Sequence, residues 1–125
     1  MWLDSGHECA FLDGEPQAIA ALAEAPELAI PVIVVGEFTF GIARSRHRDA
    51  YERSLQRILN RCTVLDIGIA TARHYAGIRV ELKQSGRPIP ANDVWIAALG
   101  RQYSMPVMSR DQHFDQVSGL RRRTW

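Results

Sequence analysis

Short apolar stretches alternate with helical patterns along this chain, and that alternation constrains the fold more than any other feature. The apolar stretches are MWL at 1–3, LAI at 28–30, TVLDI at 63–67, PVMS at 106–109 and LRRRTW at 120–125. Strands that alternate with helices are typical of α/β proteins, in which the helices cover a mostly parallel sheet. We therefore predict an α/β fold with a mostly parallel sheet.

Two of the intervening segments, 47–62 and 70–86, have the three- and four-residue apolar spacing of amphipathic helices. The second ends at Gly86, as helices commonly do. A third segment, IPVIVVGEFTFGIAR at 30–44, is ambiguous. Its β-branched residues favour a strand, whereas Pro31 is compatible with the first turn of a helix.

Composition indicates a globular protein with one core. The chain has 125 residues, of which 46% are hydrophobic and 23% charged, and no stretch suggests a linker, so we expect a single domain over 1–125. The N-terminus lacks the features of a signal peptide and no apolar run is long enough to cross a bilayer, so we expect a cytoplasmic protein without membrane association. Cys9 and Cys62 are expected to be reduced thiols.

Charge alone does not indicate a nucleic-acid partner, because the net charge is only +1. Lys83 is the single lysine, and arginines gather in RSRHR at 44–48 and RRR at 121–123. Such clusters commonly lie on a solvated face or protect an edge strand. Arginine also binds phosphate in a bidentate manner, so a role in partner binding stays open.

Four acidic residues occupy positions at which α/β proteins build functional sites. Asp4 and Asp111 follow predicted strands, Asp93 opens a predicted helix, and Glu37 lies within an apolar run. Taken singly, the three aspartates are also compatible with helix caps or Asx turns, and Asn92 with a cap. Glu37 is harder to explain without a partner, since a carboxylate is seldom buried alone.

Four segments together resemble the PIN-domain family, and most closely its VapC-like ribonuclease toxins. An Asp-Ser pair follows the first strand, Glu37 precedes Gly41 by four residues, Asn-Asp opens an apolar helix, and a Ser-Arg-Asp-x-x-Phe element lies near the C-terminus. The segments are WLDSGHECAFLDGEP, IPVIVVGEFTFGIARS, GRPIPANDVWIAALG and VMSRDQHFDQVSGL. Their order and spacing extend the resemblance over nearly the whole chain, and imply a three-layer PIN-like fold with four to five strands.

The resemblance also implies a site. Its acidic quartet is Asp4, Glu37, Asp93 and Asp111, with supporting candidates Ser5, Asn92, Ser109 and, at the periphery, Asp115. The segment from Pro31 to about Ser45 is expected to be helical, despite its β-branched residues. Three histidines, His47, His74 and His113, have no partner identifiable from spacing and are expected at the surface or stacked against neighbours.

Converging carboxylates need a cation, or some of them must stay protonated. Two unit charges about 4 Å apart repel by roughly 4 kcal/mol at an effective dielectric near 20. Oxygen ligands favour Mg²⁺ or Mn²⁺, and such an ion can activate water for attack on a phosphodiester. The expected function is therefore metal-dependent hydrolysis of RNA, with Asp4, Asp93 and Asp111 holding the ion and Glu37 positioning or activating water.

Partners follow from the same resemblance. VapC-like toxins are held inactive by an antitoxin, and the resemblance also implies a homodimer built on apolar helical faces. Arg44, Arg46 and Arg48 are candidates for contact with RNA phosphate or an acidic antitoxin segment.

One segment departs from the family pattern. After Asp4 the chain reads Ser5-Gly6-His7-Glu8-Cys9, where the family has further polar side chains and then an apolar run. This departure keeps open a PIN fold that binds RNA or protein without catalysis. His7-Glu8 does not begin a metalloprotease motif, because position 11 is Phe.

A phosphoacceptor receiver domain has the same alternation of strands and helices. It needs an acidic pair after the first strand and a lysine near the last, and this chain lacks both.

Overall fold

The computed structural model describes residues 2–3 and 28–124. Five short strands and four α-helices lie in these residues, with one 3₁₀ helix near the C-terminus. In chain order they are β1 (Trp2–Leu3), β2 (Ala29–Pro31), α3 (Val32–Ala43), α4 (Arg48–Arg61), β3 (Thr63–Leu65), α5 (Ile69–Ser85), α6 (Ala91–Tyr103), β4 (Val107–Met108), η1 (Gln112–Gln116) and β5 (Arg122–Arg123). Each apolar stretch predicted as a strand overlaps one, and both predicted amphipathic helices are present.

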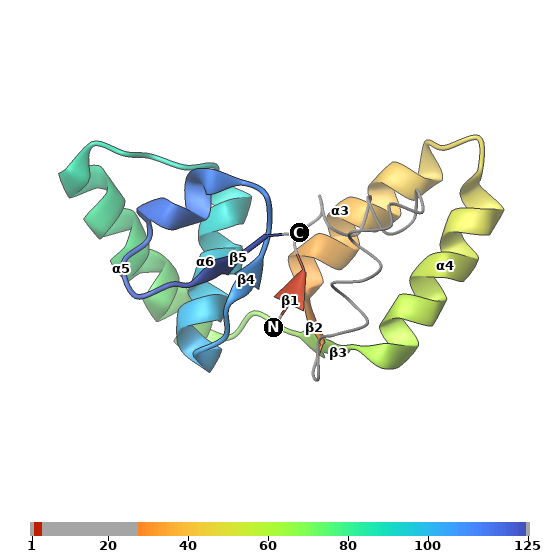
Figure 1. Cartoon of the computed structure of the whole chain (residues 1–125), viewed down its shortest axis with the longest axis horizontal. Coiled ribbons are helices and arrows are strands. Elements are labelled where there is room, and N and C mark those ends of the chain that lie inside the picture. The colour runs from red at the N-terminus through yellow and green to blue at the C-terminus, as the bar shows by residue number, and fades with distance from the viewer. Residues whose placement is uncertain (1, 4–27, 125) are drawn as a thin grey trace.

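The strands form one sheet in the order β3-β2-β1-β4-β5, and every pair is parallel. Figure 1 shows α3 and α4 on one side of the strands and α5 and α6 on the other. The predicted α/β architecture with a parallel, helix-flanked sheet is confirmed. The last strand, Arg122–Arg123, lies at an edge of the sheet, where arginines discourage pairing with another chain.

The ambiguous segment is a helix. Pro31 ends β2 with φ −63° and stands immediately before the first turn of α3, where its fixed φ and missing N–H are tolerated. Val34, Phe38 and Ile42 are buried at a spacing of four residues. Burial of this stripe outweighs the modest preference of β-branched residues for strands, so the helix expected from Pro31 to about Ser45 is confirmed.

Helix α6 lies at the centre of the packing. Ile96, Ala97, Ala98, Leu99 and Gly100 are all buried. On its flank, the ring of Trp95 stacks on Tyr75 of α5, with centroids 3.9 Å apart. Gly86 adopts the left-handed conformation that ends α5, as the sequence predicts. Across residues 2–3 and 28–124 no helix has both the length and the apolar character to cross a membrane.

Candidate metal centre

Asp93 is mounted on a rigid helix. It is the third residue of α6, and the chain enters that helix through Pro90, whose carbonyl accepts a hydrogen bond from the Val94 N–H. The residues that follow are buried, so the first turn cannot shift without disturbing the core. A carboxylate in this turn is also favoured by the helix dipole.

Asp111 is fixed by its own turn. It follows β4 and caps η1, because its Oδ1 accepts a 2.9 Å hydrogen bond from the backbone N–H of His113. The backbone N–H of Asp111 in turn donates to Oγ of Ser109, which is fully buried. The capping interpretation of Asp111 is therefore confirmed, and the cap uses only one of its two carboxylate oxygens.

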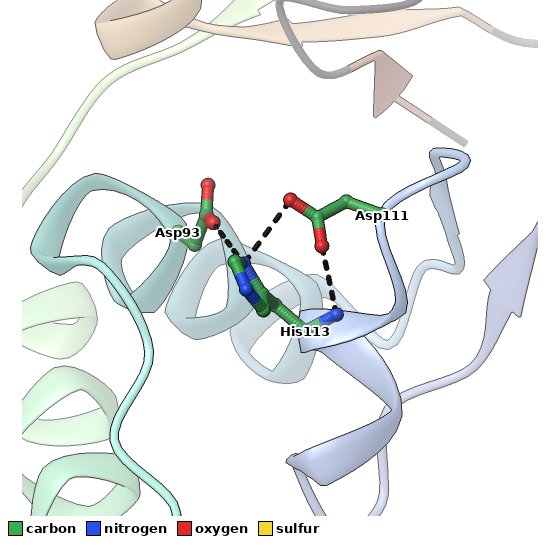
Figure 2. Close-up of side chains that lie close together, drawn as sticks. All are labelled: Asp93, Asp111 and His113. Carbon is green, nitrogen blue, oxygen red and sulfur yellow. Dashed lines mark hydrogen bonds and ion pairs between the residues drawn. The ribbon is translucent and has the colours of Figure 1, made fainter.

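The second oxygen of Asp111 faces Asp93 across a histidine ring. Nδ1 of His113 lies 3.2 Å from Asp93 Oδ2 and 3.1 Å from Asp111 Oδ2. Figure 2 shows the imidazole between the two carboxylates. One potential ligand atom from each residue lies within 4.8 Å of the others. Because these donors are two hard oxygens and one nitrogen, the group fits a small divalent cation.

Glu37 and Asn92 form a second contact beside the first turn of α6. Asn92 Nδ2 donates to Glu37 Oε1 at 2.6 Å, which joins α6 to α3. Among the residues that the structure describes, Glu37 does not belong to the group of ligand atoms formed by Asp93, Asp111 and His113. The expectation that Asn92 caps α6 is wrong, since the helix begins after Pro90 without a side-chain cap.

Asp115 is turned toward an arginine. Its carboxylate accepts hydrogen bonds from Nε and Nη2 of Arg122 at 2.9 and 3.0 Å. These hydrogen bonds hold the pKa of Asp115 below its ordinary value. Arg122 also donates from Nη1 to the Ser109 carbonyl at 3.2 Å. The pair thus ties β5 to η1 and to the end of β4, and braces the turn that carries Asp111.

The three arginines predicted to contact RNA or an antitoxin lie where α3 connects to α4. The guanidinium of Arg44 lies 5.5 Å from the ring centroid of Phe40, a side chain that is 63% exposed. Arg46 and Arg48 are exposed and line an open hollow together with Arg53. Asp4 and Ser5, the other predicted site residues, lie outside the residues that the structure describes.

The place of His113 in this group does not follow from its spacing in the sequence. A residue expected at the surface or stacked against neighbours is indeed 47% exposed, but its ring contacts two predicted site residues. The sequence does contain an indication of this contact. An Asp that caps a short turn brings the residue two positions later close to its own carboxylate. His113 stands in that position after Asp111.

A PIN-domain family model matches residues 3–120. The chain belongs to the PIN-domain family. Its PIN domain is 29% identical over 102 residues to ribonuclease VapC2 of Haemophilus influenzae, which covers 81% of this chain and 77% of that protein.

Solved structures agree with this PIN fold. VapBC2 of Rickettsia felis, crystallised with a DNA fragment from the promoter, superposes with a TM-score of 0.88 at 22% identity, covering 99% of this chain and 97% of the other. VapBC-5 of Mycobacterium tuberculosis, a member of the VapBC family of toxin–antitoxin systems, superposes with a TM-score of 0.75 at 26% identity, covering 98% and 94%.

Proposed function

We propose that this PIN-domain protein is a Mg²⁺- or Mn²⁺-dependent endoribonuclease that hydrolyses RNA phosphodiester bonds in the cytoplasm, as the toxin of a toxin–antitoxin pair. The observation that carries the proposal is the convergence of Asp93, Asp111 and His113 within 4.8 Å. The similarity to a ribonuclease and to a toxin–antitoxin structure supplies the substrate class and the partner.

Asp93 and Asp111 would hold the divalent ion through Oδ2, and the family pattern adds Asp4 as a third carboxylate. When bound, the ion supplies a polarised water and neutralises negative charge that develops on the phosphate. Glu37 would orient that water and accept its proton. Asn92 keeps one oxygen of Glu37 engaged and so fixes the direction of the carboxylate.

Binding of RNA and of the antitoxin would use the exposed arginines. Arg46 and Arg48 present guanidinium groups near the start of α4, and Arg44 lies over Phe40 at the end of α3. Guanidinium groups suit both phosphate and carboxylate partners. A homodimer is proposed from the same family likeness.

Metal-dependent cutting of RNA by the purified full-length chain tests the proposal. Single-stranded RNA and a transfer RNA mixture should be cut with Mn²⁺ or Mg²⁺ and left intact in EDTA. Asp93→Asn should slow cutting by roughly 100-fold or more, because it removes a charge that holds the ion. Asp66→Asn is the control, since it makes the same change of charge at an exposed aspartate outside the Asp93, Asp111 and His113 group.

Cutting that persists in EDTA or in Asp93→Asn would overturn the nuclease proposal. RNA binding without cutting would instead support the second candidate, a PIN fold that binds without catalysis. The altered segment Ser5-Gly6-His7-Glu8 favours that candidate, because it replaces side chains next to Asp4.

A further inference from the structure

His113 presents one ring nitrogen to two carboxylate oxygens at once. Nδ1 lies 3.2 Å from Asp93 Oδ2 and 3.1 Å from Asp111 Oδ2. A ring nitrogen carries at most one hydrogen, so it cannot give both oxygens a well-directed hydrogen bond. In the tautomer with its proton on Nε2, Nδ1 turns a lone pair toward them. Three electron pairs then converge, and a cation is the partner that satisfies all three.

The separations also match those of a coordination sphere. Ligand atoms about 2.1 Å from an ion, and at right angles around it, lie roughly 3.0 Å from each other. The two measured separations from Nδ1 are close to this value. A small shift of side chains would therefore convert the contact into a site with one nitrogen and two oxygens.

The backbone around His113 is held in place without help from the ring. Its N–H donates to Asp111 Oδ1, and the next residue, Phe114, is only 1% exposed. The imidazole itself is 47% exposed, so water can complete the coordination sphere. The ring is thus positioned by η1 but remains accessible from solvent.

We propose that His113 is a direct ligand of the divalent ion through Nδ1, and that it biases the site toward Mn²⁺ over Mg²⁺. This inference deepens the proposed function and rests on its metal dependence. Imidazole is a common ligand of transition-metal ions, whereas Mg²⁺ is usually held by carboxylates, substrate phosphates and water. A nitrogen donor therefore strengthens Mn²⁺ binding more than Mg²⁺ binding.

Manganese binding to the full-length chain, without RNA, tests the inference. Electron paramagnetic resonance counts unbound Mn²⁺ and gives its affinity, Mg²⁺ competition gives the preference, and electron spin-echo modulation detects a ¹⁴N nucleus bonded to the ion. The variants are His113→Asn, whose amide reaches the position of Nδ1, and His113→Gln, whose amide reaches the position of Nε2. His47→Asn is the control, because His47 is exposed at the start of α4.

Wild type and His47→Asn should bind Mn²⁺ with ¹⁴N modulation. In His113→Asn the modulation should disappear and the affinity for Mn²⁺ should fall by roughly tenfold or more, since even the loss of a partner outside the coordination sphere costs about that factor. The affinity for Mg²⁺ should fall less, so the preference for Mn²⁺ should shrink. His113→Gln should weaken binding of both ions. Thermal unfolding in EDTA should leave all variants near wild type, since the ring is half exposed.

The inference is overturned if wild type binds no Mn²⁺, if it lacks ¹⁴N modulation, or if His113→Asn keeps the wild-type preference. These outcomes are distinguishable from failure of the proposed function. Nitrogen-coordinated Mn²⁺ in a protein that cuts no RNA would support the ligand assignment and contradict the nuclease. Metal-dependent cutting without ¹⁴N modulation would support the nuclease and contradict the ligand assignment.

Discussion

Asn92 donates a 2.6 Å hydrogen bond to Glu37, from the first turn of α6 to the middle of α3. The residue next to Asn92 is Asp93, so one helical turn both fixes the carboxylate of Glu37 and presents a carboxylate of its own. A neutral amide therefore links the carboxylate of Glu37 to the turn that carries Asp93. An amide suits this position because it donates to a carboxylate without adding charge.

Asn92→Ala should lower RNA cutting while leaving the fold intact. The substitution removes the donor that orients Glu37, but Asn92 is exposed and caps nothing, so the free energy of unfolding should change by less than about 1 kcal/mol. Asn92→Asp should lower activity further, because it sets a second negative charge beside Glu37. Initial cutting rates and urea unfolding of both variants measure the effect. Equal rates in wild type and Asn92→Asp would contradict a role for this hydrogen bond.

Divalent ions should stabilise the protein through the Asp93–Asp111 site. A ligand that binds only the folded state at 100 times its Kd adds about 2.7 kcal/mol to the free energy of unfolding. Added Mn²⁺ should therefore raise Tm in a concentration-dependent manner for wild type and for Asp66→Asn. Asp111→Asn should lose most of this rise, as differential scanning fluorimetry would show. An undiminished rise in Asp111→Asn would mean that the ion binds elsewhere.

Asp115 should make stability sensitive to acid. Its pKa is lowered by the hydrogen bonds from Arg122, so the fold favours the carboxylate. The resulting stabilisation is present above the unfolded-state pKa, which is about 3.9 for Asp, and is lost as the pH falls through the lowered folded-state value. The stability difference between wild type and Asp115→Asn should therefore shrink as urea titrations move from pH 6 to pH 3. It should be modest, because Asp115 is half exposed.

Arg122→Met tests whether the contacts of Arg122 also support metal binding at Asp111. It removes the donors to Asp115 and to the Ser109 carbonyl, so the turn that carries Asp111 loses its brace. We expect weaker Mn²⁺ binding than in Asp115→Asn, which keeps the contact to Ser109. The same manganese titration compares the two variants. Identical affinities would show that the Ser109 contact does not brace the site.

Substitution of Thr71 should lower the free energy of unfolding markedly. It is fully buried, accepts a 3.1 Å hydrogen bond from the Gly68 N–H at the start of α5, and donates to Gln102 of α6. Thr71→Val keeps the shape but leaves both partners unsatisfied, which should cost about 1–3 kcal/mol in urea unfolding. Thr71→Ser retains the hydroxyl and should lose less. A larger loss in the serine variant would show that packing of the methyl group dominates.

The fold was largely predictable because local patterns and burial agree along most of the chain. The amphipathic segments form α4 and α5, and each short apolar stretch overlaps a parallel strand. Residues 30–44 were the exception, since their propensity favours a strand while burial of Val34, Phe38 and Ile42 requires a helix. Tertiary packing decided that segment, and only the family resemblance anticipated it.

Of the four predicted acids, the structure brings Asp93 and Asp111 together, but the contacts of the predicted residues do not follow from the sequence. Asp93 and Asp111 could be selected by their positions at strand and helix ends, yet nothing in spacing shows that Asn92 reaches Glu37 or that Arg122 occupies Asp115. Those pairs join elements far apart in sequence, and their side-chain directions depend on packing. The contacts of His113 are not visible in the sequence, because its partners are brought to it by a cap and by a separate helix.

The order of strands also decides when, during synthesis, the site can form. The first strand of the chain, β1, lies at the centre of the sheet, and its neighbour β4 is made more than a hundred residues later. Until Val107–Met108 and the following turn have emerged from the ribosome, Asp93 has neither Asp111 nor His113 to face. The three side chains of this centre can therefore meet only after β4 has taken its place beside β1.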